Sequence, residues 1–143
     1  MIEVTITNRQ KLLRLHRPDL QALTRHVLAT EGFRHAEISL AFLDDARIAE
    51  LNERFLHHAG PTDVLTFHFS QDDQPLAAEI VISVETAVRE SRRRRLQPED
   101  EVRLYLIHGL LHLCGFGDLT LAQRRRMHHR QRSLLQAWQK GHR

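Results

Sequence analysis

The chain has 143 residues, of which 41% are hydrophobic and 27% charged, so it is long and apolar enough to form one globular domain. No apolar run approaches the roughly 20 residues of a membrane-spanning helix, and the N-terminus lacks the basic and apolar regions of a signal peptide. The single cysteine, Cys114, excludes an internal disulfide, and we therefore expect a cytoplasmic protein without a membrane partner.

The formal net charge of +3 is unevenly distributed. Residues 1–118 carry 14 basic and 18 acidic side chains, whereas residues 119–143 carry 7 basic and no acidic ones. A basic C-terminal segment indicates a polyanionic partner, but a solvated helix face would have the same composition. The sequence leaves both interpretations open.

Hydrophobic patterning alternates between period 2, typical of strands, and the helical period. In chain order we predict a strand at Ile2–Thr7, a helix from Pro18 to Gly32, a strand at Glu37–Leu43, a helix from Asp44 or Asp45 to about Phe55, strands at Asp63–Phe69 and Glu79–Val84, a helix at Glu85–Arg95, a helix from Pro98 to Gly115, and a helix from Thr120 to about Gln139. This order predicts an α+β fold over residues 1–143: a single compact domain with a small mixed four-stranded sheet and about five helices.

Two predicted elements carry additional signals. The helix after Pro98 is apolar nearly all round, so we expect it to be central and buried. Thr120 and Gln123 have the spacing of a capping box at the start of the last helix. In the strand before Ser70, alternation places Leu65, Phe67 and Phe69 on one face, where core packing is the simpler explanation.

A metal site is predicted on the buried helix. His108 and His112 are four residues apart, so their imidazoles project from one side of the helix. The helix ends at Gly115, and Asp118 follows in a turn that can bring a carboxylate back as third ligand. Three protein ligands with an open fourth position are typical of catalytic zinc, although two histidines at this spacing also occur by chance.

The residues beside the two histidines limit which reactions a metal site here could catalyse. Gly109 stands where metalloproteases with a His-Glu-x-x-His motif have their general base, which disfavours peptidase chemistry. The missing side chain would instead allow close approach of a strand or a substrate. Cys114 lies two positions after His112 and points away from the histidine face, so we interpret it as a small buried residue.

Three blocks of sequence resemble the YbeY family of bacterial endoribonucleases. The first runs from His108 to Phe116 and matches His-Gly-x-Leu-His-Leu-x-Gly-(Tyr/Phe). The second comprises Leu51-Asn52 and Thr62–Phe67, and the third is Ala78–Ser83. The blocks occur in the family's order.

The resemblance implies the family's α+β fold, a cytoplasmic location, and three metal ligands, with Zn²⁺ as the expected ion and another divalent metal as an alternative. It further implies a metal-dependent endoribonuclease that cuts single-stranded RNA in ribosomal RNA processing, small-subunit maturation and ribosome quality control. The expected partners are ribosomal RNA and the small ribosomal subunit, with ribosomal proteins or an assembly GTPase as further candidates.

Four departures from the family pattern bear on the predicted site. Asp118 replaces the third histidine ligand, Gly117 replaces the preceding Asp, and Glu79 replaces Asp in the third block. Leu56 stands where the family has a basic residue that the resemblance links to phosphate contact and catalysis. This last departure favours an alternative function, a metal-stabilised ribosome assembly factor that binds RNA or protein without cutting. A metal-dependent hydrolase of another substrate is a third possibility.

The general base is not identified by the sequence. Glu79, His57 and His58 are candidate catalytic residues. If the two arginine-rich helices pack side by side, their basic residues would form one RNA-binding surface. The candidates on this surface are Arg92, Arg93, Arg124 and Arg125. Aromatic residues are only 6% of the chain, so we expect binding to the RNA backbone rather than base stacking on exposed rings.

Overall fold

A computed structural model describes residues 1–56 and 63–141 of the chain, except the side chains of Phe55 and Leu56. Four strands form one mixed sheet: β1 (Ile2–Arg9), β2 (Ala36–Leu43), β3 (Val64–His68) and β4 (Leu76–Ser83). Five helices accompany it: α1 (Arg17–Thr30), α2 (Asp45–Leu56), α3 (Val84–Arg94), α4 (Pro98–Leu113) and α5 (Leu121–Gly141). The predicted α+β fold, with four strands and five helices, is confirmed.

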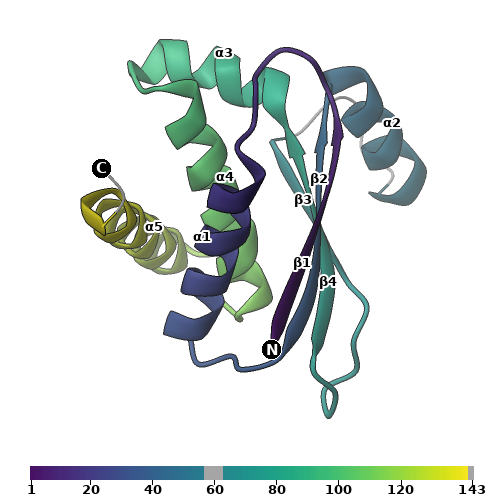
Figure 1. Ribbon diagram of the computed structural model, residues 1–143, viewed down its shortest axis with the longest axis vertical. Coiled ribbons are helices and arrows are strands. Elements are labelled where there is room, and N and C mark those ends of the chain that lie inside the picture. Colours follow the sequence, from purple (N-terminus) through teal and green to yellow (C-terminus); the bar gives the residue numbers. More distant parts are fainter. Residues whose placement is uncertain (57–62, 142–143) are drawn as a thin grey trace.

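The sheet has the strand order β1-β2-β4-β3. β1, β2 and β4 are parallel, and β3 pairs antiparallel with β4 at the edge. The connections between parallel strands pass through helices, as such pairs require. α1 and α4 cover one face of the sheet and α2 covers the other (Figure 1).

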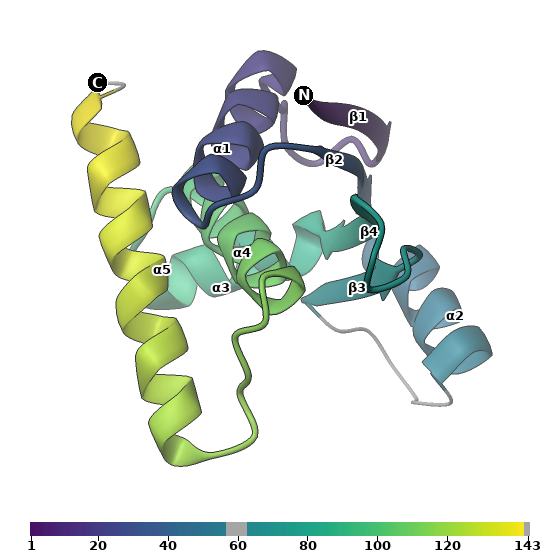
Figure 2. The ribbon, with the colours of Figure 1, turned by 90° about the horizontal axis from the view of Figure 1, so that it is seen from below.

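α4 lies between the sheet and α5, which explains why it is apolar on all sides (Figure 2). Pro98 occupies its first turn together with three acidic residues, which suit the positive end of the helix dipole. The chain leaves the helix through Gly115, whose φ of 99° is readily adopted only by glycine. The predicted central helix is thereby confirmed.

α5 is fixed at both its start and its middle. The capping box is present: the Gln123 backbone N–H donates to Thr120 Oγ1 at 3.1 Å, and the Thr120 N–H donates to Gln123 Oε1 at 3.2 Å. Further along, Arg130 donates to Glu31 Oε1, just after α1, at 2.8 Å. The apolar side of α5 packs on α4, and no helix among the described residues is long and apolar enough to span a membrane.

Two expectations about the strands were inexact. β4 begins at Leu76 rather than Glu79, because its first residues pair with both β2 and β3. Phe69 was expected to pack in the core, but it lies beyond the end of β3 and is 68% exposed. Leu65 and Phe67 do pack under α2. The predicted alternation is therefore correct as far as His68, the last residue of β3 that pairs with β4.

Candidate metal centre

His108 and His112 lie one helical turn apart near the C-terminal end of α4. Their Nε2 atoms approach to 3.0 Å, and the two rings meet edge to face with centroids 4.5 Å apart. Both nitrogens therefore point at a common position beside the helix. Burial, followed by the neighbouring His112, lowers the pKa of His108 and favours the neutral imidazole, which is the form that binds metals.

Asp118 reaches the same position from the turn after α4. Its Oδ2 lies 3.3 Å from His112 Nε2, and its side chain is 45% exposed. The first turn of α5 holds this loop: Gln123 accepts a hydrogen bond from the Leu119 backbone N–H at 3.0 Å. Arg124 donates to the carbonyl oxygens of Asp118 and Leu119 at 3.3 and 3.2 Å.

The three ligand atoms fit a tetrahedral metal. They all lie within 4.8 Å of one another. Bonds of about 2.05 Å at tetrahedral angles separate neighbouring ligand atoms by about 3.3 Å, close to the 3.0 and 3.3 Å found here. Cys114 is not part of the cluster, and burial raises the pKa of its thiol to about 12, so it stays protonated. The residues present fit a zinc-type ion.

Gly109 brings this turn of α4 against the sheet. A Cβ atom at this position would lie 3.0 Å from Ile80 Cγ2, 3.3 Å from Val64 Cγ1 and 3.4 Å from Thr66 Cγ2. The missing side chain therefore serves the close approach of two strands, one of the two roles expected for it. Because His108 precedes Gly109 in the same helix, this close packing sets the position of His108 relative to β3.

Gln131 is a site residue that the sequence analysis missed. It is only 8% exposed, and its side-chain amide bonds Nδ1 of His108. The atom in contact is the amide nitrogen Nε2. Turned over so that Oε1 faces the ring, the amide would accept the Nδ1 proton that His108 carries when its Nε2 faces a metal, which would fix the ring and its tautomer. The available signal was a polar residue within the apolar stripe of Met127, Leu134, Leu135 and Trp138.

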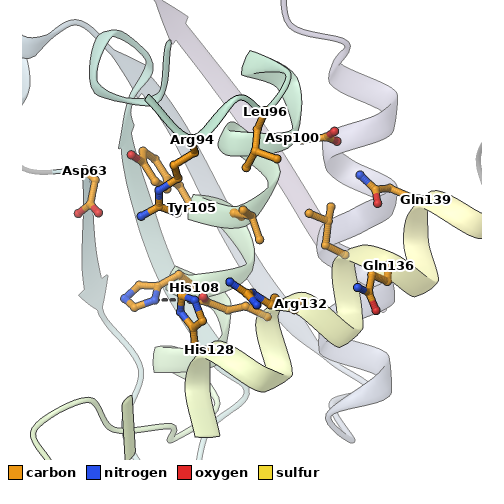
Figure 3. A pocket seen from close by; sticks show the side chains of 13 residues that line it. Asp63, Arg94, Leu96, Asp100, Tyr105, His108, His128, Arg132, Gln136 and Gln139 are labelled. Carbon is orange, nitrogen blue, oxygen red and sulfur yellow. Dashed lines mark hydrogen bonds between the residues drawn. The ribbon is translucent and has the colours of Figure 1, made fainter. Parts of the chain in front are cut away.

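A cleft of about 810 Å³ opens beside His108 (Figure 3). α4 and the chain after α3 form one wall, and α5 forms the other. Arg94, Arg132 and His128 contribute its basic groups. Of the three clustered residues, His108 borders this space, which is large enough for a substrate, whereas His112 and Asp118 do not line it.

Comparison with known proteins identifies the family. The family model described as "Endoribonuclease YbeY" matches residues 5–139. The chain belongs to the YbeY endoribonuclease family. It is similar to the YbeY endoribonuclease of Syntrophus aciditrophicus, with 36% identity over 118 residues, 79% of this chain and 74% of that one.

Further relatives cover more of the chain. The YbeY endoribonuclease of Thermobifida fusca is 30% identical over 141 residues, 92% of this chain and 86% of that one. The solution structure of a Thermotoga maritima protein has the same fold, with a TM-score of 0.66 and 22% identity over 96% of this chain and 89% of that one.

The three sequence blocks that carry the YbeY resemblance meet at Gly109. The first block forms the end of α4 and its turn, the second contributes β3, and the third forms β4. A Cβ at Gly109 would meet Val64 and Thr66 from the second block and Ile80 from the third. The blocks, separated in sequence, thus build one neighbourhood around the histidines.

The candidate catalytic residues are not brought to this centre. Glu79 accepts a hydrogen bond from Ser39 at 3.3 Å, on the sheet face that α2 covers. Its neighbour Ile80 faces α4, and successive strand residues point to opposite faces, so Glu79 is directed away from His108. His57 and His58 lie outside the described residues, as does the side chain of Leu56.

The arginine candidates do not form one continuous surface. α3 and α5 each pack on α4 rather than along one another. Arg93 on α3 pairs with Glu90 at 2.7 Å and Arg92 is exposed, whereas Arg124 is engaged with the loop carbonyls. Arg125 lines a second hollow of about 410 Å³ on α5, together with Arg124, His128, His129 and Arg132.

Replacing Gln131 with Leu is expected to weaken zinc binding by about 10- to 100-fold, because the Nδ1 proton of His108 loses its acceptor. Leu has a similar size and suits the apolar stripe, so the fold should persist. Gln131→Glu keeps an acceptor and should bind zinc at least as tightly as the wild type. A competition titration with a zinc chelator measures this; equal affinities for all three proteins would refute the orienting role.

Glu101 is a buried acid one helical turn before Tyr105. Its side chain is 0% exposed, and among the described residues neither carboxylate oxygen has a hydrogen-bond partner. Arg94 Nη1 lies 3.4 Å from Oε1, the one ion pair that compensates the charge within this part of the chain. Burial raises the pKa of Glu101 despite the attraction of Arg94. The carboxylate form therefore costs stability.

Glu101→Gln is expected to increase the free energy of unfolding at pH 7 by about 1–3 kcal/mol. Because the folded-state pKa lies above the ordinary value of 4.5, the penalty is absent below pH 4.5 and grows as pH rises through the folded pKa. The gain in unfolding free energy of Glu101→Gln over the wild type should therefore be small below pH 4.5 and increase as the pH rises. Urea unfolding in a chelator, with the exposed Glu99→Gln as control, tests it; a less stable Gln variant at pH 7 would contradict it.

Proposed function

We propose that this chain is a metal-dependent endoribonuclease that cuts single-stranded regions of ribosomal RNA during maturation and quality control of the small ribosomal subunit. The observation that carries the proposal is the convergence of His108, His112 and Asp118 on one position, with His108 bordering a cleft, in a member of the YbeY family. Residues 1–143 act as one domain in this proposal.

His108, His112 and Asp118 are the proposed ligands, and zinc is the proposed ion. Two neutral imidazoles and one carboxylate suit zinc better than magnesium, which prefers an oxygen environment. A zinc ion bound there would polarise a phosphoryl oxygen and make a water molecule more acidic. The partly exposed sides of His112 and Asp118 leave room for RNA to reach that position.

The protein's own groups bind and align the strand. Arg125 on α5 presents positive charge to the phosphates, the neighbouring histidines offer hydrogen-bonding groups, and Arg92 and Arg93 provide a separate basic area on α3. Arg124 contributes by positioning the loop that carries Asp118. Gln131, with Oε1 turned towards Nδ1, would hold His108 in the tautomer that presents Nε2. Glu79 has no role in this mechanism.

The remaining elements of the proposal follow from ribosomal RNA as substrate. The activity would take place in the cytoplasm, on the small subunit or its precursors. Ribosomal proteins or an assembly GTPase are proposed to deliver the enzyme to its cleavage site. The basic C-terminal segment suits a substrate of high negative charge.

Metal removal tests the proposal. Tag-free protein incubated with a chelator should lose cleavage of a ribosomal RNA fragment, and one equivalent of zinc should restore it. A mock purification from cells that do not express the chain should not cut. Cleavage that persists after complete metal removal would contradict a metal-dependent mechanism. RNA binding without cleavage by the zinc-loaded protein would instead support the assembly-factor function.

A further inference from the structure

The cleft between α4 and α5 has two chemically different ends. One end is formed by His108 and its partner Gln131, so the cleft begins beside the imidazole whose Nε2 faces the proposed metal position. The other end is formed by Gln136 and Gln139, two amides on successive turns of α5 (Figure 3). The proposed function uses the first end alone.

The lining between these ends combines apolar and basic side chains with two carboxylates, Asp63 and Asp100, and Asp100 pairs with Arg103 at 2.8 Å. Tyr105 and Leu135 are 7% and 8% exposed, so they form a packed apolar floor. Arg132 lies on the α5 side, and within the described part of the chain it forms no ion pair. Arg94, by contrast, is paired with the buried Glu101. Arg132 is thus the basic group of the cleft that is available to an anion.

The cleft is also continuous with the basic hollow on α5. Arg132 and His128 line both. A negatively charged strand can therefore follow α5 from the hollow into the cleft without leaving basic side chains. The cleft volume of about 810 Å³ falls within the roughly 300–1,000 Å³ range of sites that enclose small organic ligands.

We propose that the α4–α5 cleft binds one nucleotide of the RNA strand next to the phosphate that is cleaved. The base lies on the floor of Tyr105 and Leu135, Gln136 and Gln139 bond its polar edge, and Arg132 binds its phosphate. This site deepens the proposed function and rests on it. It gives the enzyme a contact with an unstacked base, which a paired strand could not supply.

Titration of adenosine 5′-monophosphate into the zinc-loaded full-length protein, followed by amide NMR signals, tests the site. The signals of Leu104, Gln136 and Gln139 should shift. The nucleotide should bind about 10-fold more tightly than inorganic phosphate, because the base adds apolar contact. Shifts confined to the loop at Asp118, or equal affinities for nucleotide and phosphate, would overturn the inference.

Two charge variants on α5 provide the matched comparison. Arg132→Gln should weaken nucleotide binding by about 10-fold, since a charged hydrogen-bond donor is lost. Lys140→Gln removes the same charge from an exposed position that does not line the cleft, and should change the affinity less than about 2-fold. Equal losses in both variants would show general charge attraction and overturn the site.

A second pair tests the site during RNA cleavage. Gln136→Glu introduces a negative charge of nearly the same shape and should raise KM for a short single-stranded RNA by about 10-fold, with kcat within about 2-fold. Ser133→Glu adds the charge at an exposed position outside the cleft and should leave both parameters near the wild type. An unchanged KM in Gln136→Glu would contradict the site.

The results separate the two proposals. Nucleotide binding in the cleft by a protein that never cuts RNA would keep the cleft as a nucleotide site and overturn both the proposed activity and the position of this site next to a cleaved phosphate. RNA cleavage without any shift of the cleft signals would support the proposed activity and overturn the inference.

Discussion

His112→Ala is expected to reduce zinc affinity by more than about 100-fold, because loss of a ligand should exceed the 10- to 100-fold effect of losing a partner behind one. The substitution also removes the shared contact of the cluster, since His112 Nε2 lies 3.0 Å from His108 Nε2 and 3.3 Å from Asp118 Oδ2. Cleavage of a ribosomal RNA fragment should fall to the level of the chelated wild type.

A histidine elsewhere provides the control for this prediction. His16 precedes α1, is exposed and makes no capping hydrogen bond through its side chain, so His16→Ala should bind zinc and cut RNA as the wild type does. Circular dichroism should show that both variants are folded. Cleavage by His112→Ala at the wild-type rate would remove His112 from the mechanism and point to a contaminating nuclease.

Gly109→Val is expected to lower the free energy of unfolding by about 3 kcal/mol, because the new side chain must displace packed atoms. Its Cβ alone would lie 3.0 Å from Ile80 Cγ2 and 3.3 Å from Val64 Cγ1, and the Cγ atoms need additional space. α4 must then move away from β3 and β4, which displaces His108 relative to Asp118. Zinc affinity should therefore fall together with stability.

Gly141→Val is the matched substitution, at a helical glycine of α5 whose Cβ would meet nothing within 4 Å. Urea unfolding of the metal-free proteins should show less than about 0.5 kcal/mol of change for this control. Gly109→Ala should fall between the two, because its better helix propensity of about 1 kcal/mol offsets part of the crowding. A loss below about 1 kcal/mol for Gly109→Val would contradict the close packing of α4 on the sheet.

Local signals in the sequence predicted much of the fold because each acts over a few residues. The capping box of Thr120 and Gln123, Pro98 in a first turn and the glycine at position 115 all occur as the sequence indicates. The apolar residues on every side of α4 predicted that this helix is buried at the centre of the fold. His108 and His112 could be paired from spacing alone, because they lie on one helix.

Features that depend on how helices and strands pack against one another were harder to predict from the sequence. Gln131 reaches His108 only because α5 packs on α4, and no local pattern states which turn of α5 meets the histidine. Glu79 was a candidate because it lies in a family block, yet the register of β4 directs it to the opposite face. Phe69 is exposed because the cover provided by α2 ends before it.

Zinc-edge X-ray absorption on an RNA-cleaving preparation that contains one zinc per chain tests the metal centre most directly. His108, His112 and Asp118 predict two imidazole nitrogens and at least one oxygen at about 2.0–2.2 Å, with no sulfur. The signal of two imidazoles should disappear in His112→Ala. A sulfur ligand at about 2.3 Å, or an unchanged spectrum in that variant, would contradict the proposed centre.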